Sequence, residues 1–362
     1  MTNEIEDLMS SEHIEEDNEE SEQGFYKYSS IENTYRQEYI DRTKAQGYKD
    51  IQYLITEKVH GSNTQVSFDG SNFVYGTRTH FLCDDEKCYN LQGIIEPLKE
   101  KISILFHELK TQFHSINKLI IFGEVCGGSY PHVDVEKNNK AIKVQKGVFY
   151  TPDNVWLIFD MCIVFNDGSR EYLSQELTMF YCKQHCLPHV PILKVTNSLD
   201  EALAYPNDEP SVVYKTFNLP PIEDNIMEGV VIKPYKISPF IGQSRVIFKN
   251  KNEKFKEKAH ARRKPLVQVE LPEHLVSVVQ QMSEYVTENR ITNIISHYGE
   301  PAMSDLGAII KEANLDVIKS FNDDTGLLNT LEKNEQKIVT RLVSKDIAQL
   351  VKEQVMSKIR GL

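Results

Sequence analysis

The hydrophobic pattern of this chain changes its period near residue 265, and this change limits the folds that the chain can adopt. Before residue 265, short runs of β-branched and aromatic residues alternate with stretches of helical spacing, and Asp69-Gly70 between two such runs is typical of a hairpin turn. After it, apolar residues recur only at helical spacing. The pattern favours an α+β domain of antiparallel sheets flanked by helices over residues 25–264, followed by an all-helical domain over residues 265–362.

The same pattern predicts the individual elements. The expected strands are Tyr53–Ile55, Thr64–Phe68, Phe73–Tyr75, Leu119–Phe122, Val155–Phe165, Met227–Pro234 and Ser244–Lys249. The expected helices are Tyr35–Gln46, Asn90–Phe113 and Gln175–Cys186 in the first domain, and Pro272–Val286, Ile291–His297, Asp305–Phe321 and Leu327–Ile359 in the second.

Residues 1–24 hold much of the negative charge. They contain ten Asp or Glu and no Lys or Arg, whereas the whole chain has a net charge of −12. Subtracting these ten from the 53 acidic residues leaves 43 against 41 basic residues, so the rest of the chain is nearly neutral. Because a run of Glu, Ser, Asp and Asn cannot bury enough apolar area to offset chain entropy, we predict a disordered acidic tail over residues 1–24.

Targeting signals are not evident in the sequence. No apolar run approaches the ~20 residues needed to cross a bilayer, so no membrane partner is expected. The N-terminus has no basic region followed by an apolar block, and it is acidic rather than Arg-rich, which argues against a signal or transit peptide. We therefore expect a soluble intracellular protein, in the cytoplasm or nucleus.

The six cysteines do not form the dense framework of a small secreted domain, so reduced thiols are the simpler interpretation. Cys182 and Cys186, with His185 and His189 nearby, leave a zinc site open as an alternative. No second Cys or His pair lies at finger-like spacing, and the segment is typical of the apolar face of a helix.

A lysine motif lies between two expected strands, in the segment Lys58-Val59-His60-Gly61-Ser62-Asn63. A lysine amine must lose a proton before it can act as a nucleophile, which partial burial or a neighbouring cation favours. Gly61 allows close approach of the backbone to a ligand, and Asn63 can hydrogen-bond a ribose hydroxyl. Taken alone, the segment is more typical of a surface lysine before a turn, because a six-residue match is weak evidence.

Two further segments combine a carboxylate with an apolar strand. Glu124 follows the strand Leu119–Phe122 and precedes Gly127 and Gly128, where it could accept hydrogen bonds from a ribose or hold a metal. Phe159-Asp160 is expected at a strand end, where Phe159 could stack on a purine and Asp160 could organise cations. A loop Glu and a core Phe are the plainer alternatives.

The last two segments pair an acidic residue with basic ones. Glu228 opens the strand Glu228-Gly-Val-Val-Ile-Lys233-Pro and could bind the divalent ion that neutralises a triphosphate. Lys249 and Lys251 point to the same face if their segment is a strand, and their repulsion favours an anion between them, such as a phosphate. A capped edge strand and a solvated basic face are the alternatives.

Each segment is a weak signal, but all five occur once and in one order. Together they resemble the nucleotidyltransferase motifs of covalent nucleotide-dependent ligases and capping enzymes. The set is most similar to the RNA ligase 2 family, which is found in phage and is related to kinetoplastid RNA-editing ligases. The resemblance covers about residues 32–258; the helical domain matches only in position and helical character.

The resemblance implies an ATP-dependent RNA ligase that joins 3′-hydroxyl and 5′-phosphate ends of RNA through a covalent lysyl-AMP, with Mg²⁺ or Mn²⁺, as in RNA repair. Lys58 would be the nucleophile. The other implied roles are the following: Glu57 and Val59 flank the adenine, Phe159 stacks on it, Asn63, Arg78 and Glu124 hold the ribose and phosphates, Lys249 and Lys251 contact the α-phosphate, Glu228 binds the metal, and His60, Asp160 and Lys233 belong to the same motifs.

Partners and competing functions follow from the same comparison. The implied partner is RNA, as a nicked duplex or paired ends, and we expect a monomer to bind it through the basic stretch Lys249–Lys264. Cys126-Gly127-Gly128 departs from the family pattern and affects the expected loop geometry. A capping-type guanylyltransferase is disfavoured by His60 in place of Asp and by the helical C-terminal domain. A non-catalytic RNA-binding relative is disfavoured because all the expected Lys, Glu and Asp positions are occupied.

Overall fold

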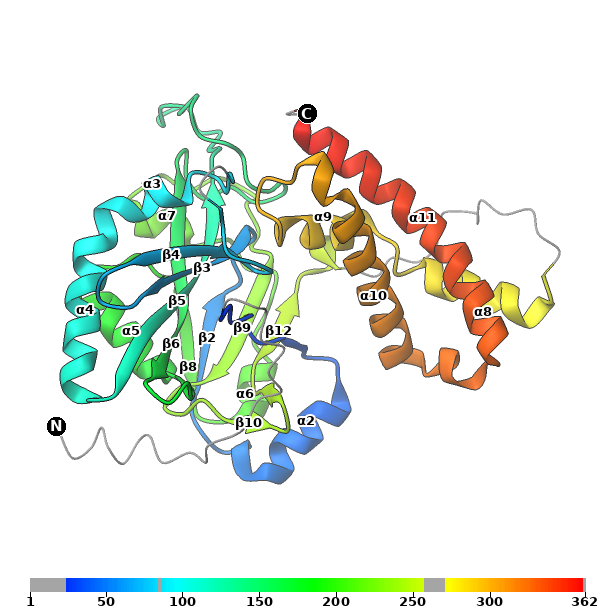
Figure 1. Cartoon of the computed structure of the whole chain (residues 1–362), viewed down its shortest axis with the longest axis horizontal. Coiled ribbons are helices and arrows are strands. Elements are labelled where there is room, and N and C mark those ends of the chain that lie inside the picture. The colour runs from blue at the N-terminus through cyan, green and yellow to red at the C-terminus, as the bar shows by residue number, and fades with distance from the viewer. Residues whose placement is uncertain (1–23, 84–85, 257–270, 361–362) are drawn as a thin grey trace. The chain divides into compact units, whose positions relative to one another are not determined.

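The computed structural model describes residues 24–83, 86–256 and 271–360 (Figure 1). The chain divides into two compact units, Met1–Asn252 and Glu253–Leu362. The predicted tail falls on residues 1–23, outside the described residues, apart from Gly24. The predicted boundary between residues 264 and 265 also lies outside them.

Two five-stranded sheets form the first unit. All their strand pairs are antiparallel except β1–β12, which confirms the predicted α+β class. The first sheet has the order β1 (Glu32–Asn33), β12 (Phe248–Lys251), β9 (Gly229–Pro234), β2 (Tyr53–Glu57) and β8 (Ile192–Thr196), and the second has the order β4 (Phe73–Thr77), β3 (Ser62–Phe68), β5 (Ile116–Gly127), β6 (Asn154–Phe165) and β7 (Arg170–Tyr172), with a separate hairpin of β10 (Phe240–Ile241) and β11 (Ser244–Arg245).

Helices cover the outer faces of both sheets. The helix predicted over Asn90–Phe113 is interrupted, because Pro97 lacks a backbone N–H and begins a tighter turn. The elements are α2 (Gln37–Thr43), a π-helical turn (Lys44–Tyr48), α3 (Leu91–Ile95), a 3₁₀ turn (Glu96–Leu98), α4 (Lys99–Gln112), α5 (Gln175–Gln184), α6 (Leu199–Leu203) and α7 (Val213–Thr216).

Strand β5 shows how the layers pack. Leu119 and Ile121 join the core formed with α4 and α5, whereas Ile120 and Phe122 join a second cluster on the other face. Because successive side chains of a strand point to opposite faces, the apolar run at 119–122 means that this strand is covered on both sides. The other sheet packs through β2, β9 and β12 against α2 and α6.

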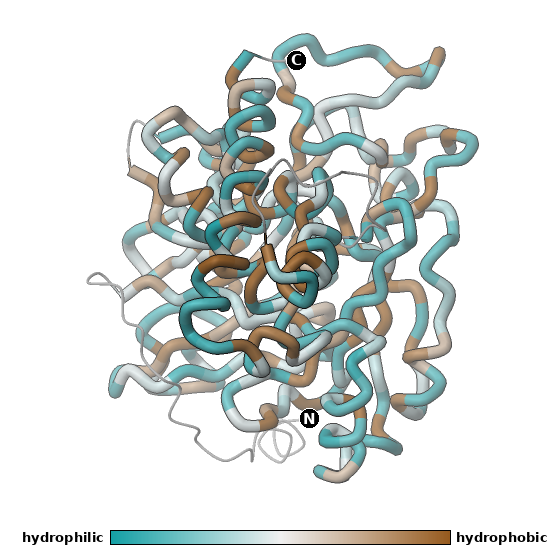
Figure 2. The backbone as a smooth tube through the Cα atoms, turned by 90° about the vertical axis from the view of Figure 1, so that its right-hand side faces the viewer, coloured by the Kyte–Doolittle hydropathy of each residue, from teal (hydrophilic) through white to brown (hydrophobic). Residues whose placement is uncertain are grey.

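In its described residues, the second unit contains helices joined by turns and no strand. It contains the helices α8 (Glu273–Ser283), α9 (Glu288–Ser296), α10 (Leu306–Thr325) and α11 (Lys333–Ile359), and the 3₁₀ turns Glu253–Phe255, Met303–Asp305 and Leu327–Thr330. The helix predicted over Leu327–Ile359 is split, because a capping box between Glu332 and Glu335 starts α11 anew. Figure 2 shows hydrophobic and hydrophilic residues alternating along the helices. The buried hydrophobic residues of the second unit form a single core.

A helix that crosses a bilayer needs ~20 mostly apolar residues. In the described parts of both units, no helix combines the length and the apolar character that this would need.

A buried indole makes one glycine of β5 indispensable. Trp156 in β6 is 1% exposed, and its Nε1–H donates to Thr64 Oγ1 over 2.9 Å. A Cβ on Gly123 would lie 2.3 Å from the same Nε1. We expect Gly123→Ala to push the indole out of its hydrogen bond and to lower the free energy of unfolding by about 1–3 kcal/mol. Thermal unfolding followed by circular dichroism measures the change.

Gly307→Ala is the matched control, because a Cβ there meets no atom within 4 Å and the site lies in the first turn of α10. It should leave the melting temperature unchanged or slightly raised. Equal melting temperatures for Gly123→Ala and the parent would contradict this account of the packing.

Candidate active site

The first sheet brings both ends of the motif set together at Gly229. This glycine opens β9, which lies between β2 and β12, and it pairs with Lys251 of β12. On the other side, β2 ends opposite Val230, and the N–H of Lys58 donates to the Gly229 oxygen over 2.9 Å. Gly229 has a φ of +148°, and a Cβ there would lie 2.0 Å from the Asn250 oxygen. Only glycine fits this position, which explains the Glu-Gly order of the motif.

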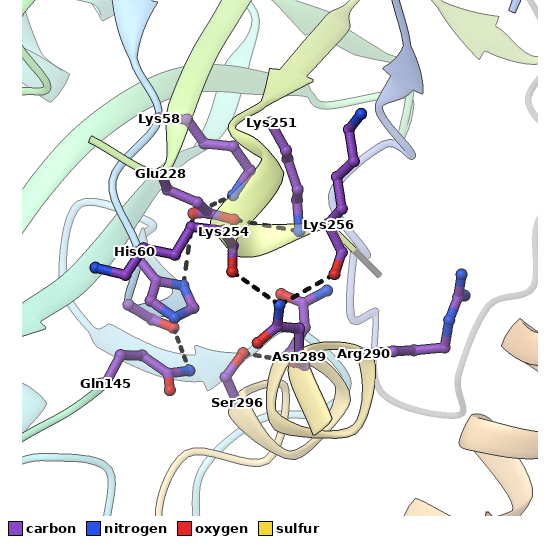
Figure 3. Close-up of polar contacts among 12 residues, drawn as sticks. Lys58, His60, Gln145, Glu228, Lys251, Lys254, Lys256, Asn289, Arg290 and Ser296 are labelled. Carbon is purple, nitrogen blue, oxygen red and sulfur yellow. Dashed lines mark hydrogen bonds and ion pairs between the residues drawn. The ribbon is translucent and has the colours of Figure 1, made fainter. Parts of the chain in front are cut away.

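Glu228 lies between two lysines (Figure 3). Its Oε2 accepts a hydrogen bond from Lys58 Nζ at 2.8 Å, and its Oε1 is 3.2 Å from Lys251 Nζ. The carboxylate is 1% exposed, the Lys58 side chain 17% and the Lys251 side chain 10%. Burial alone would raise the pKa of Glu228, but the Lys58 and Lys251 ammonium groups hold it well below its ordinary value. The site therefore contains a buried carboxylate that stays ionised between two cations.

The second sheet contributes a second carboxylate. Glu124 of β5 faces Asn63 of β3 in the register, and its Oε1 accepts the Gly61 N–H over 3.0 Å. Burial raises the pKa of Glu124 to about 7, and the negative charge of Glu228 adds to this rise. The positive charges of Lys58 and Arg78 act in the opposite direction. These mutual effects place Glu124 in the same electrostatic environment as Lys58, Glu228 and Arg78.

His60 and its neighbours also line this region. His60 Nδ1 lies 3.5 Å from Glu228 Oε2, and Val59 is buried. Glu57 is 1% exposed, and its Oε2 accepts the Val212 N–H over 2.8 Å. Its Oε1 has no hydrogen-bond partner among the residues that the structure describes. Burial raises the pKa of Glu57 to about 7, so this carboxyl oxygen is a group that a ligand could satisfy.

The prediction that Phe159-Asp160 stands at a strand end is wrong, because both residues lie inside β6. Ile158 pairs with Gly123 and Asp160 pairs with Phe122, which leaves Phe159 as the extra residue of a β-bulge. The bulge frees the Phe159 ring from the regular alternation of the strand. The ring is half-buried, 5.0 Å from the Tyr28 ring centroid.

Asp160 has a full set of protein partners. It accepts hydrogen bonds from Tyr28, Lys233 and Arg245 on Oδ2 and from Gln175 and its neighbour's N–H on Oδ1. Burial opposes ionisation, but the two cations lower the pKa of Asp160. Lys233 also donates to the Phe159 carbonyl oxygen over 2.8 Å, so this network fixes the backbone of the bulge.

The structure also identifies positioning groups that the sequence did not suggest. The N–H of His60 donates to Tyr150 Oη over 2.8 Å, and Gln145 Nε2 donates to the Gly61 oxygen over 3.2 Å. Both come from the irregular connection between β5 and β6, where no periodic pattern marks a buried residue. Lys249 precedes Lys251 by two residues on β12, so the two lysines share a face as predicted.

The donor set of the site fits a hard divalent cation only in part. In the described segments, no group of three or more His, Cys, Asp or Glu could hold a metal, which also leaves the zinc alternative at Cys182 without support. Mg²⁺ is usually held by one or two carboxylates together with substrate phosphates and water. Glu228 and Glu124 would provide such carboxylates once a nucleotide's phosphates are present.

Comparison with known proteins agrees with this geometry. A family model described as RNA ligase matches residues 51–251, and a model described as T4 RNA ligase 2 C-terminal matches residues 269–349. The chain is 25% identical to the mitochondrial RNA-editing ligase 2 of Trypanosoma brucei brucei, over 83% of this chain and 84% of that protein. It is 23% identical to the mitochondrial RNA-editing ligase 1 of the same organism, over 86% of this chain and 80% of that protein.

Among solved structures, an apo mutant of an RNA ligase from Naegleria gruberi aligns with a TM-score of 0.44 and 18% identity. The alignment covers 65% of this chain and 58% of that one.

The two raised carboxyl pKa values predict how stability depends on pH. A Glu57 with a folded pKa of about 7 and an ordinary value of 4.5 keeps its proton longer in the folded state. Its favourable contribution is complete below pH 4.5 and is lost as the pH rises through 7. Glu57→Gln removes this loss, so we expect the variant to be more stable than the parent at pH 8, by roughly 1–3 kcal/mol, with little difference at pH 4.5.

Melting temperatures of both proteins across this pH range provide the measurement. Exposed Glu136 offers the control: Glu136→Gln should run parallel to the parent at every pH. A Glu57→Gln curve that is also parallel to the parent would refute the assignment.

Proposed function

The chain belongs to the RNA ligase family, whose model matches more than half of it, and we propose that it joins RNA 3′-hydroxyl and 5′-phosphate ends in three nucleotidyl transfers with ATP as the activating nucleotide. The observation that carries the proposal is the group Lys58–Glu228–Lys251, in which a half-buried amine lies beside an ionised carboxylate and a second cation.

In the first transfer, the Lys58 ammonium gives a proton to solvent, and the free Nζ amine attacks the α-phosphorus of ATP. A P–N bond forms, the P–O bond to the β-phosphate breaks, and pyrophosphate leaves. Glu228, 2.8 Å from Nζ, orients the amine. Lys251 supplies positive charge where negative charge gathers around phosphorus, so that catalysis depends on positioning and electrostatics.

In the second transfer, the AMP moves from Lys58 to the 5′-phosphate of an RNA. In the third, a 3′-hydroxyl attacks that activated end, a phosphodiester forms, and AMP leaves. The same cations act in each step, because each gathers charge around one phosphorus. A divalent ion held by Glu228 and the nucleotide's phosphates would add positive charge at this place.

The remaining site residues are proposed to bind the nucleotide. Their proposed roles are those implied by the resemblance: Glu57 and Val59 beside the adenine, Phe159 stacked on it, Asn63, Arg78 and Glu124 at the ribose and phosphates, and Lys249 with Lys251 at the α-phosphate. The unpartnered, buried Oε1 of Glu57 supports the first of these, since an adenine amino group can donate to it. The β-bulge at Phe159 supports the stacking role of Phe159, because it frees the ring from the regular alternation of the strand.

The substrate is proposed to be a nicked duplex or paired ends of RNA, bound by a monomer. The matches to the RNA ligase model and to the C-terminal model of T4 RNA ligase 2 support RNA as the substrate. Domains over residues 25–264 and 265–362 and a cytoplasmic or nuclear location stay predictions, and the basic residues 257–264 lie outside the described residues.

Intact mass after incubation with ATP and Mg²⁺ tests the covalent step. We expect the parent to gain the mass of AMP and Lys58→Ala to gain none, because the proposed P–N bond needs the Lys58 amine, which Glu228 Oε2 holds at 2.8 Å. A parent that binds RNA but never gains this mass would favour a non-catalytic relative. Label taken from GTP alone, with none from ATP, would favour a capping-type guanylyltransferase.

Lys251 tests the electrostatic part of the mechanism. We expect Lys251→Ala to slow formation of the lysyl-AMP by about 10²–10³-fold, the loss typical of one charge-stabilising group. Single-turnover kinetics at saturating ATP measure the rate. Lys236→Ala, at an exposed position after β9, is the control and should react at the parental rate. A Lys251→Ala rate within threefold of the parent would remove Lys251 from the mechanism.

A further inference from the structure

The connection between β5 and β6 is long and irregular, yet it is held at many points. Val144 lies in the core of the unit, and its N–H donates to the Gly127 oxygen. Asn154 makes two hydrogen bonds with the backbone of Ile142. Its Oδ1 accepts the Ile142 N–H over 2.9 Å, and its Nδ2 donates to the Ile142 oxygen over 2.7 Å. Asn138 Nδ2 donates to Asp153 over 2.7 Å. The segment therefore has a defined position rather than that of a loose loop.

The same connection is attached to the proposed active site from two directions. Gln145 and Tyr150 contact the lysine motif at Gly61 and His60. Asn225, three residues before Glu228, exchanges two hydrogen bonds with the backbone of Phe149, at 2.9 and 2.7 Å. The end of the segment at Gln145 therefore lies beside the lysine motif. Figure 3 shows Gln145 next to His60.

Lysines recur at every third position of this segment: Lys137, Lys140, Lys143 and Lys146. All four are exposed, and no acidic residue lies between the first and the last. Within the described residues, Lys137, Lys140 and Lys143 have no ion pair. Lys143 lies 4.9 Å from the Phe149 ring, and burial together with the neighbouring Lys146 lowers the pKa of Lys143.

A fixed row of like charges is unfavourable by itself. The hydrogen bonds that hold the segment limit how far the lysines can separate, and no carboxylate within residues 137–146 offsets their mutual repulsion. A polyanion would offset it, with the release of counterions. The segment can span at most about 30 Å, which is several times the ~3.4 Å rise between successive phosphates of one duplex strand. Its length therefore suits a nucleic-acid backbone better than the compact triphosphate of a nucleotide.

We propose that Lys137–Lys146 is an RNA-contact surface, which binds successive phosphates of the RNA substrate next to Lys58. The proposal rests on the proposed function as an RNA ligase and adds a binding surface to it. Because phosphate contacts carry no base information, the surface fixes the position of the strand without selecting its sequence.

Salt dependence of RNA binding provides the test. The variant replaces three lysines, Lys137→Gln, Lys140→Gln and Lys143→Gln, and its RNA Kd is measured by fluorescence anisotropy over a series of salt concentrations. Each phosphate contact contributes about 0.7–0.9 to the slope of log K against log salt, so we expect the loss of three contacts to lower the slope by roughly 2.1–2.7. AMP attachment, which needs no RNA, is expected to keep its parental ATP dependence.

The matched control removes three exposed lysines elsewhere: Lys110→Gln, Lys183→Gln and Lys236→Gln. Lys110 lies in the last turn of α4, next to the start of β5, and this strand of 12 residues separates it from the proposed surface by roughly 40 Å. Both triple variants lose the same charge, so only a local effect distinguishes them. The control should keep the parental slope.

Three results would overturn the proposal: an unchanged slope, an equal fall in the control, or a raised KM for ATP with unchanged RNA binding, which would assign the lysines to the nucleotide. If the triple variant does not fold, the single variants Lys137→Gln and Lys140→Gln, each expected to lower the slope by about 0.7–0.9, decide the question. A parent that binds RNA but never gains AMP would contradict the proposed function while leaving this surface testable.

Discussion

The structure of the site depends on one buried charge, the carboxylate of Glu228. An isolated carboxylate that is 1% exposed would take up a proton, because burial disfavours the charged form. Glu228 stays ionised because the Lys58 and Lys251 ammonium groups lie beside it. Removing either lysine would leave an imperfectly compensated charge in the interior. The same pairing holds Lys58 in place before any nucleotide arrives. The fixed position of the Lys58 amine is therefore a consequence of how the Glu228 charge is stabilised.

The sheet supplies this arrangement through register alone. Lys58 and Lys251 come from the ends of two strands that both pair with β9, and Glu228 directly precedes β9. A shift of one residue in either pairing would turn a lysine to the opposite face. The register is held by the buried residues of β2, β9 and β12, which pack with α2 and α6. The chemistry of the site thus depends on hydrophobic packing well away from it.

Much of this could be predicted from the sequence, for a local reason. The strands that carry Lys58, Glu228 and Lys251 show periodic or β-branched patterns, and the motif residues stand at their ends, so short-range pattern was enough. The split at Pro97 follows from the missing donor of that proline. The bulge at Phe159 could not be predicted, because a β-bulge is defined by the partner strand. Gln145 and Tyr150 were missed because they act from a connection without periodicity, where only tertiary contacts show what is buried.

Two buried acidic residues of the first unit, Asp160 and Glu57, differ in whether the protein itself satisfies their hydrogen bonds. Asp160 accepts hydrogen bonds on both oxygens from five groups of the protein, so it is complete without a ligand. Glu57 Oε1 is buried but accepts no hydrogen bond from the described residues, whereas Glu228 Oε1 has the Lys251 ammonium 3.2 Å away. A buried acceptor without a donor costs about 1–3 kcal/mol, and a fold retains it where a ligand relieves the cost. The satisfied network stabilises the bulge at Phe159, and the unsatisfied Glu57 oxygen is where the proposed nucleotide would complete the protein's own hydrogen bonding.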